Sequence, residues 1–233
     1  VFVIVGLVLT GRLFVLQVKN GEAYEERSAQ NHLEHTTIFA DRGIVYDRNG
    51  LEIAWNDLNP GGDYALRLYA TTSGLSHISG YIKYPAKDKQ GIYYEYAFTP
   101  KGGVEEYFNE VLAGTNGLKI TETDAHGTVQ SESVLTPPRD GNNIFLSIDR
   151  RVTERLHQAI ASTAAEREFV GGAGVIVDIH TGEILALTSY PEFDSNVMTA
   201  SQDKERIRGF LGDKGNAFLN RAIGGQFIPG AIM

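Results

Sequence analysis

Two short apolar runs in the C-terminal half constrain the fold more than any other stretch of the chain. Residues 173–178 and 183–189 are rich in β-branched and aliphatic side chains, and a turn at residues 179–182 separates them. Runs of this length around a tight turn predict two antiparallel strands. Asp178 can hydrogen-bond to nearby backbone groups, and Gly182 can adopt a positive φ without steric cost. Because both runs are almost continuously apolar, we expect strands that are covered on both faces.

The words in and after this hairpin resemble those of a known family. Residues 178–191 read D-x-x-T-G-E-I-L-A-L-x-S-x-P, and Asn220-Arg221-Ala222 and Pro229-Gly230 follow. The order is similar to the start of the transpeptidase domain of a class B penicillin-binding protein. In that family the nucleophilic serine of S-x-x-K follows the Pro-Gly pair, where this chain has Ala231. The resemblance therefore implies an N-terminal fragment that ends at the active-site serine position, with no catalytic residue present and no activity as given.

The resemblance implies a serine-type D,D-transpeptidase function for the intact family. Such enzymes transfer an acyl group from D-alanyl-D-alanine peptide stems, crosslink peptidoglycan and are acylated by β-lactams, and they need no cofactor. A serine at the start of a helix and a lysine one turn later are required for that step. The alternative is a non-catalytic extracytoplasmic scaffold that binds and activates a membrane glycan polymerase. A third class, an anchored sensor or adhesion module with no link to cell-wall synthesis, is disfavoured by the ordered set of motifs.

Length, charge and cysteine content exclude other classes of function. The 233 residues are enough for two modest domains. With 29 acidic and 21 basic residues the formal charge is −8, which argues against nucleic acid as a partner. The absence of cysteine excludes disulfides and thiolate metal sites.

The N-terminus carries the only long apolar run. Residues 1–18 predict a partial transmembrane anchor, with the body of a single-pass cell-membrane protein on the extracytoplasmic side. A buried core helix is the alternative. Residues 21–35 predict a polar helix on which His32 and His35 lie three positions apart. This spacing suits two metal ligands, but no third ligand is evident, so we predict a solvated pair and no metal site.

The word R-G-I-V-Y-D-R-N-G at residues 42–50 predicts a type I′ hairpin, with Asn49-Gly50 as its turn. The same word is similar to one of the family's most specific motifs. Arg42, Asp47 and Arg48 could form a charged binding site. We favour the structural interpretation, in which they form ion pairs that brace the pedestal.

Four further features carry the remaining predictions for the segment between residues 77 and 130. The tyrosines at 81, 84, 93, 94 and 96 indicate either an exposed aromatic surface for a partner or packing within a sheet. Residues 104–112 have the apolar spacing of a helix with one buried face, ended by Gly114. Residues 118–120 and 128–130 predict another hairpin. The H-x-x-G-Y element that begins at His77 resembles the elongation-type members of the family.

The Pro-Pro linker around residues 136–143 is the predicted domain boundary. We therefore expect an α+β protein with an anchor at 1–18, a hairpin-rich pedestal or dimerisation-type domain at 19–140, and the start of a transpeptidase domain, an antiparallel sheet with helices, at 141–233. Asp149 should cap a helix whose inner face is formed by Val152, Leu156, Ala159, Ile160 and Thr163. Ser201 to Lys204 is a literal S-x-x-K, which we interpret as a decoy because no Pro-Gly pair precedes it.

Overall fold

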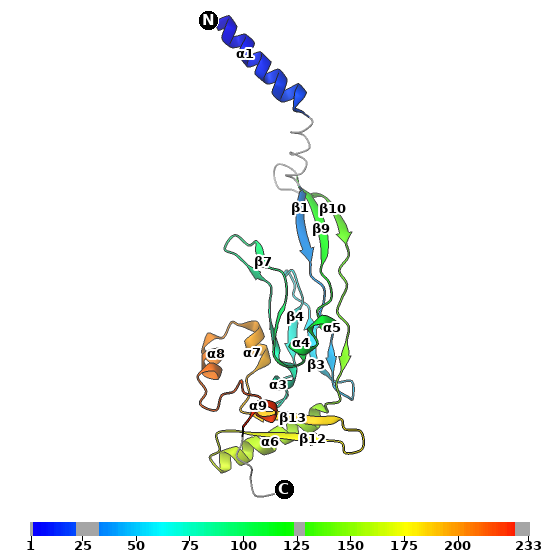
Figure 1. Ribbon diagram of the computed structural model, residues 1–233, viewed down its shortest axis with the longest axis vertical. Coiled ribbons are helices and arrows are strands. Elements are labelled where there is room, and N and C mark those ends of the chain that lie inside the picture. The colour runs from blue at the N-terminus through cyan, green and yellow to red at the C-terminus, as the bar shows by residue number, and fades with distance from the viewer. Residues whose placement is uncertain (1, 22–32, 124–128, 227–233) are drawn as a thin grey trace. The chain divides into compact units, whose positions relative to one another are not determined.

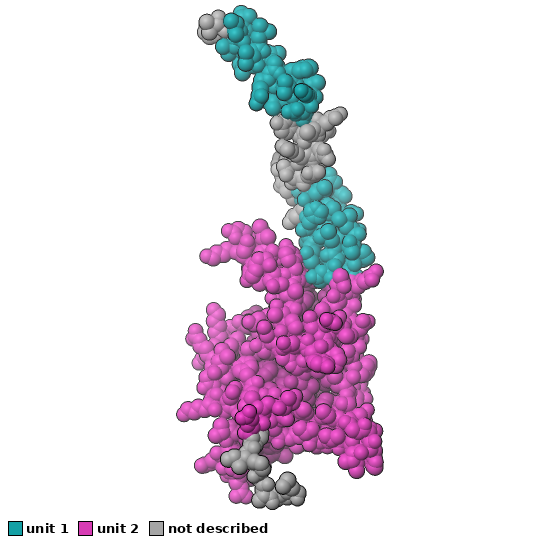
Figure 2. Space-filling view, in the orientation of Figure 1, with its two compact units in different colours: residues 1–38, 116–138 teal, residues 39–115, 139–233 magenta. Residues whose placement is uncertain are grey.

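A computed structural model describes residues 2–21, 33–123 and 129–226 (Figure 1). The chain divides into two compact units, coloured separately in Figure 2. Unit 1 comprises Val1–Ile38 and Asn116–Pro138, and unit 2 comprises Phe39–Thr115 and Arg139–Met233. Helices and mostly antiparallel strands are combined, as the predicted α+β class requires.

The N-terminal part of unit 1 is helical. Helix α1 (Phe2–Phe14) runs directly into a π-helical turn, η1 (Val15–Lys19). Within the described ranges no helix combines the length and hydropathy needed to cross a bilayer. The predicted anchor at residues 1–18 therefore stays a prediction.

A three-stranded antiparallel sheet forms the rest of unit 1. Its order is β1 (Leu33–Ile38), β9 (Gly117–Thr123) and β10 (Val129–Thr136). The β9–β10 pairing confirms the predicted hairpin, and Lys119 pairs with Glu132 across it at 3.0 Å. The prediction of a helix over residues 21–35 is wrong at its end, because residues 33–35 pair with β9 as a strand. Most of that segment, residues 22–32 with His32, lies outside the described residues.

Unit 2 is built on a four-stranded sheet. Its order is β11 (Ile144–Phe145), β2 (Val45–Tyr46), β3 (Glu52–Asp57) and β4 (Leu66–Tyr69), with only β11 and β2 parallel. Val45, Ile53 and Ala54 are fully buried on it and pack with Tyr69 and Leu112. β11 follows the predicted linker, so residues from both sides of that linker share one sheet.

The turn between β2 and β3 differs from the predicted type. The hairpin is confirmed, but only Gly50 of the Asn49-Gly50 pair has a positive φ, at 78°. A type I′ turn needs positive φ at both central residues. The reason is Asp47, whose Oδ1 accepts the backbone N–H groups of Asn49 at 2.7 Å and Leu51 at 2.8 Å. This Asx-type bonding holds Asn49 in an ordinary conformation and leaves Gly50 alone to reverse the chain.

Short ribbons carry the tyrosine-rich segment of unit 2. β5 (Tyr81–Lys83) pairs with β8 (Thr99–Lys101), and β6 (Ala86–Lys87) pairs with β7 (Tyr93–Glu95). Tyr64, Tyr93 and Phe98 pack edge-on against the buried ring of Phe39. Tyr94 is 71% exposed. The two interpretations of the tyrosines therefore apply to different residues, since some pack inside the unit and others face solvent.

The segment predicted as one helix over residues 104–112 is two short ones. α4 (Gly103–Tyr107) and α5 (Asn109–Leu112) meet at Phe108, whose φ of −103° and ψ of 24° break the helix. Tyr107, predicted on the buried face, is 83% exposed, whereas Glu105 is fully buried. Glu105 is buried because its carboxylate has cationic partners inside unit 2.

Helix α6 (Arg150–Glu166) begins as predicted. Asp149 is its N-cap and accepts the N–H groups of Arg151 and Val152. Its buried residues are Thr153, His157 and Ala164, so the predicted inner face was rotated: Val152, Ala159 and Thr163 are exposed. The rotation follows from polar contacts, since the His157 ring bonds to Thr188 Oγ1 at 2.9 Å.

The hairpin predicted over residues 173–189 is present. β12 (Gly172–Val177) and β13 (Ile184–Tyr190) pair antiparallel, Asp178 accepts the N–H of His180 at 2.8 Å, and Gly182 has a φ of 77°. Helix α6 packs along both strands, and α3 (Ser76–Ser79), α7 (Ser195–Ala200), α8 (Lys204–Leu211) and α9 (Arg221–Gly224) complete unit 2 (Figure 1).

The prediction of cover on both faces is wrong for β12. Within the described residues β12 and β13 form a two-stranded sheet, and Val175, Ile176 and Val177 are 45%, 37% and 48% exposed. Leaving apolar side chains in water weakens local structure.

We therefore expect the amides of Val175–Val177 to exchange hydrogen faster than those in the middle of α6. Hydrogen–deuterium exchange of the monomer, resolved by NMR, measures both in one sample. Equal protection of the two segments would contradict the exposed position of β12.

Candidate functional site

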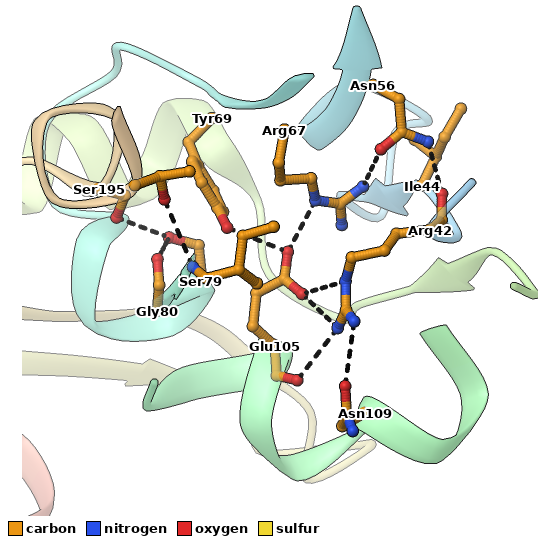
Figure 3. Close-up of polar contacts among 12 residues, drawn as sticks. Arg42, Ile44, Asn56, Arg67, Tyr69, Ser79, Gly80, Glu105, Asn109 and Ser195 are labelled. Atoms are coloured by element: carbon orange, nitrogen blue, oxygen red, sulfur yellow. Dashed lines mark hydrogen bonds and ion pairs between the residues drawn. The ribbon is translucent and has the colours of Figure 1, made fainter. Parts of the chain in front are cut away.

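The most unusual site in the molecule is a buried cluster of charges in unit 2, drawn in Figure 3. Its centre is Glu105 in the first turn of α4, with no solvent-exposed surface. Arg42, which precedes β2, donates to Glu105 Oε2 from Nη2 at 2.7 Å and from Nε at 3.0 Å. A single carboxylate oxygen therefore receives two charge-assisted bonds from one guanidinium.

A second arginine binds the other oxygen of the same carboxylate. Arg67 lies in the middle of β4 and donates from Nε to Glu105 Oε1 at 2.8 Å. Its Nη1 donates to Asn56 Oδ1 at 3.1 Å, and Asn56 Nδ2 donates in turn to the backbone oxygen of Arg42 at 2.6 Å. The cluster thus ties β3, β4, α4 and the segment before β2 to one another.

Polar neighbours complete the cluster. Asn109 accepts from Arg42 Nη1 at 3.0 Å, and the hydroxyl of Tyr69 donates to Glu105 Oε1 at 3.3 Å. Burial, together with the carboxylate of Glu105, raises the pKa of Tyr69 well above its ordinary value. Tyr69 is therefore a neutral hydroxyl donor at any physiological pH.

The electrostatics of the cluster depend on all three charges. Two guanidiniums and one carboxylate leave a net charge of +1 in a region where each side chain is at most 2% exposed. Buried ions are tolerated only when they are paired and hydrogen-bonded. The cluster presents no exposed nucleophile or base, so its chemical capacity is to lock four segments in one arrangement.

The turn at residues 47–50 is a second polar lock within unit 2. The buried carboxylate of Asp47 accepts the N–H of Arg150, the first residue of α6, at 3.2 Å. Asn49 Nδ2 donates to Asp149 Oδ2 at 2.9 Å, so the turn also holds the N-cap of that helix. Arg48 pairs with Glu183 at 3.5 Å, but both side chains are more than a third exposed. Such exposed pairs contribute little stability.

These contacts decide between the two interpretations of Arg42, Asp47 and Arg48. Arg42 is 3% exposed and Asp47 is fully buried, and both bond inward to the protein. Neither side chain can contact a ligand from outside. The structural interpretation is therefore correct for Arg42, which forms an ion pair with Glu105. Asp47 also braces unit 2, but it does so by accepting backbone N–H groups and not through the predicted ion pair.

His77 in α3 is a buried ionisable group near the same elements. Its ring packs edge-on against Phe193 with 5.3 Å between centroids and lies against the backbone of Ala217. Neither ring nitrogen makes a hydrogen bond of normal geometry with any described residue. Burial lowers the pKa of His77 from 6.5 to about 4.

This shift predicts a pH-dependent stability. Between pH 6.5 and about 4 the unfolded chain binds a proton at this histidine and the folded chain does not, so protonation favours unfolding. The free energy of unfolding should therefore fall by about 2 kcal/mol more in the wild type than in a His77→Phe variant as the pH drops through this window. Urea titrations at several pH values measure the difference, and His180→Phe, an exposed turn position, is the control. Parallel pH profiles for wild type and His77→Phe would refute it.

Three sequence features were considered for catalysis or metal binding: the nucleophile position, the S-x-x-K word at Ser201 and the histidine pair. Ala231 lies outside the described residues. Ser201 ends α7 in a left-handed conformation with its hydroxyl bonded to the oxygen of Met198, whereas Lys204 begins α8. The pair is therefore split between two helices and does not form one turn of a single helix, which confirms the decoy interpretation. His35 lies in a strand, and no group of metal-ligating side chains occurs within the described ranges.

Two members of the cluster, Arg67 and Glu105, were not predicted as functional. Arg67 interrupts an apolar strand, L-R-L-Y, and Glu105 lies among residues expected on a helix face. A charged residue within an apolar pattern is the sequence signal that could have identified these two residues. Its partner cannot be read from the sequence, because Arg42 and Glu105 are 63 residues apart.

Comparisons with known proteins match this architecture. The family model described as the penicillin-binding protein dimerisation domain matches residues 62–146. MrdA, a peptidoglycan D,D-transpeptidase of Escherichia coli K12, is 25% identical over 306 aligned residues that include 97% of this chain and 47% of MrdA. The Acinetobacter baumannii MrdA is 27% identical over 94% of this chain and 31% of its own length. FtsI of Escherichia coli K12, also a peptidoglycan D,D-transpeptidase, is 28% identical over 72% of this chain and 24% of FtsI.

A solved structure agrees with these relatives. One chain of a peptidoglycan synthase complex, described as coordinating polymerization and crosslinking, matches with a TM-score of 0.63 and 26% identity. The match covers 95% of this chain and 50% of that one. This chain thus spans between about a third and a half of the length of the relatives it matches along most of its sequence. The matched dimerisation domain and these similarities show that the chain carries a penicillin-binding protein dimerisation domain and is similar along nearly its whole length to peptidoglycan D,D-transpeptidases.

Proposed function

We propose that this chain is the pedestal and the first part of the transpeptidase domain of an elongation-type peptidoglycan D,D-transpeptidase. Its role is to hold that domain and to couple it to a membrane glycan polymerase. Crosslinking of peptide stems and reaction with β-lactams belong to the protein that carries the serine and lysine of S-x-x-K.

One observation carries the proposal. The buried cluster ties Arg67 and Glu105 of the matched dimerisation domain to Arg42. Asp47, a few residues further along the chain, accepts the N–H of Arg150 at the start of helix α6, in the predicted transpeptidase part. A rigid hydrogen-bonded cluster couples the positions of two segments more closely than a mobile linker does. The H-x-x-G-Y element that begins at His77 resembles the elongation-type members of the family and supports an elongation role over a division role.

The sequence supports the scaffold as the second candidate. At the position where the family has its nucleophile this chain has Ala231, and alanine has no oxygen to acylate. A chain with this residue can still support a polymerase. The solved complex to which it is similar coordinates polymerization with crosslinking, which makes a glycan polymerase the expected partner.

Labelling with a fluorescent penicillin separates the two candidates. We expect no labelled band from the chain as given, and a band from a chain extended to the length of the relatives and carrying Ala231→Ser. Ser201→Ala is the control and should change neither result. A band from the given chain that Ser201→Ala abolishes would overturn the assignment of the nucleophile position.

The scaffold role has its own measurement. A purified membrane glycan polymerase should polymerise its lipid-linked precursor faster when the chain is reconstituted with it, and an unrelated single-pass protein should have no effect.

In spheroplasts, residues 84–96 should be open to added protease, because we propose a membrane anchor with an extracytoplasmic body. Protection of that segment together with cytoplasmic markers would contradict this location.

A further inference from the structure

A small polar cleft in unit 2 lies apart from the buried cluster. It has a volume of about 260 Å³ and is formed by residues 70–79 on one side and residues 192–210 on the other. This size lies just below the roughly 300–1,000 Å³ of pockets for drug-sized ligands, so it suits a ligand of one or two rings. Among its polar lining residues are Thr71, Ser73, Ser76, Glu192, Asp194 and Arg206.

The walls of the cleft are fixed by hydrogen bonds. The carboxylate of Glu192 accepts the backbone N–H of Gly74 at 2.7 Å and that of Ser76 at 3.3 Å, which closes one end. Asn196 bonds to both the N–H and the carbonyl of Tyr69, each at 2.9 Å, which holds the start of α7 against β4. A cleft with such walls is formed before a ligand arrives, which lowers the entropic cost of binding.

Several polar groups in the cleft remain available. The hydroxyls of Thr71, Ser73 and Ser76 have no hydrogen-bonding partner within the described part of the chain, although all three line the cleft. Arg206 uses Nη2 for Asp194 Oδ2 at 3.1 Å, which leaves its other guanidinium donors for a ligand. Adjacent hydroxyl, carboxylate and guanidinium groups suit a ligand that both donates and accepts several hydrogen bonds.

Charge and apolar surface narrow the chemistry further. Glu192, Asp194 and Arg206 give the cleft a formal charge of −1, which disfavours phosphorylated or carboxylated ligands. Phe210 is partly exposed and adds apolar surface to the same lining, whereas Leu75 and Phe193 are only 2% and 6% exposed. A pyranose ring combines these features, because its hydroxyls bond in the ring plane and its C–H faces pack on apolar and aromatic side chains.

We propose that this cleft binds one uncharged sugar unit of a glycan strand. The inference rests on the proposed function, since a peptidoglycan synthase works on a glycan polymer, and it adds a subsite outside both the catalytic motifs and the buried cluster. The subsite would hold a strand beside the pedestal while another part of the protein acts on its peptide.

Titration with chitotetraose, a neutral tetramer of β-1,4-linked N-acetylglucosamine, tests the proposal on the full chain. We expect saturable binding by calorimetry with a dissociation constant of about 1 mM or below, typical of one small contact. Phe210→Ala should weaken binding about tenfold, and Ser73→Trp, which fills the cleft, should abolish it. Leu211→Ala is the matched control, because Leu211 is 68% exposed, follows Phe210 directly and does not line the cleft.

Two results would overturn the sugar subsite. One is the absence of binding at about 10 mM chitotetraose, well above the expected dissociation constant. The other is unchanged binding in Ser73→Trp together with unchanged thermal stability, which would place the sugar elsewhere. In the first case, binding of a stem pentapeptide would assign the cleft to the peptide and not to the sugar. None of these outcomes affects the penicillin-labelling and polymerase experiments, so failure of the subsite and failure of the proposed function are distinguishable.

Discussion

Glu105→Gln should lower the free energy of unfolding of unit 2 by about 3–5 kcal/mol, the usual cost of breaking a buried ion pair from one side. Glutamine has almost the same shape as glutamate, so packing is retained and only the negative charge is lost. The substitution leaves Arg42 and Arg67 buried, at 3% and 2% exposure, with no counter-charge between them. Their desolvation then has no compensation.

The measurement can be confined to the right unit. Trp55 is the only tryptophan of the chain and lies in β3, next to Asn56 of the cluster, so its fluorescence during urea unfolding reports on unit 2. Glu110→Gln is the matched control: it is the same substitution on the neighbouring helix α5 at an exposed position, and it should change stability by less than about 0.5 kcal/mol. Equal midpoints for the two variants would show that the cluster is not a stabilising lock.

The loss of unfolding free energy caused by Glu105→Gln should be smaller when the cation of Arg67 is removed as well. In Glu105→Gln with Arg67→Met one guanidinium leaves with its partner, so the buried charge returns to the +1 of the wild type. We expect the double variant to be more stable than the sum of the two single variants predicts, by about 1–3 kcal/mol. Additive losses would mean that the two residues do not interact.

Local features of the fold were predictable because they depend on neighbours in the sequence. The hairpin at β12 and β13 and the cap of α6 by Asp149 both follow from residues within a few positions of one another. Family resemblance added the order of the segments. It also placed the nucleophile position at Ala231, where the described residues provide no test.

Features that depend on distant partners were not predictable in the same way. The apolar spacing of residues 104–112 suggested a single helix, yet the carboxylate of Glu105 bonds to Arg42 and Arg67, 63 and 38 residues away. A contact of that range overrides a periodic pattern, because a buried ion without its partners costs more than an exposed tyrosine does. The rotated face of α6 has the same cause, since His157 bonds to Thr188 of β13.

A close backbone approach that the sequence does not reveal lies between Gly80 and Gly102, where α3 ends beside the start of α4. Gly80 has a φ of 70° and a ψ of −154°, a region that is essentially closed to side chains and costs them about 1–3 kcal/mol. A Cβ at this position would also lie 2.7 Å from the carbonyl oxygen of Lys101 and closer still to that of Gly102. Backbone atoms cannot rotate away from such a contact, so α3 and α4 would have to separate.

Gly80→Ala should therefore cost more than its backbone strain alone, about 3–5 kcal/mol in urea unfolding followed by Trp55 fluorescence. Gly102→Ala is the matched control, because Gly102 has a φ of 70° and a ψ of 173° in the same region but open space around its Cβ position. That variant should lose only the strain, about 1–3 kcal/mol. Since α4 carries Glu105, Gly80→Ala should also speed hydrogen exchange at the Phe108 amide, which donates to the oxygen of Val104 in α4 at 3.0 Å, and Gly102→Ala should change it far less. Equal losses in the two variants would mean that strain, and not the contact between α3 and α4, is what requires glycine at position 80.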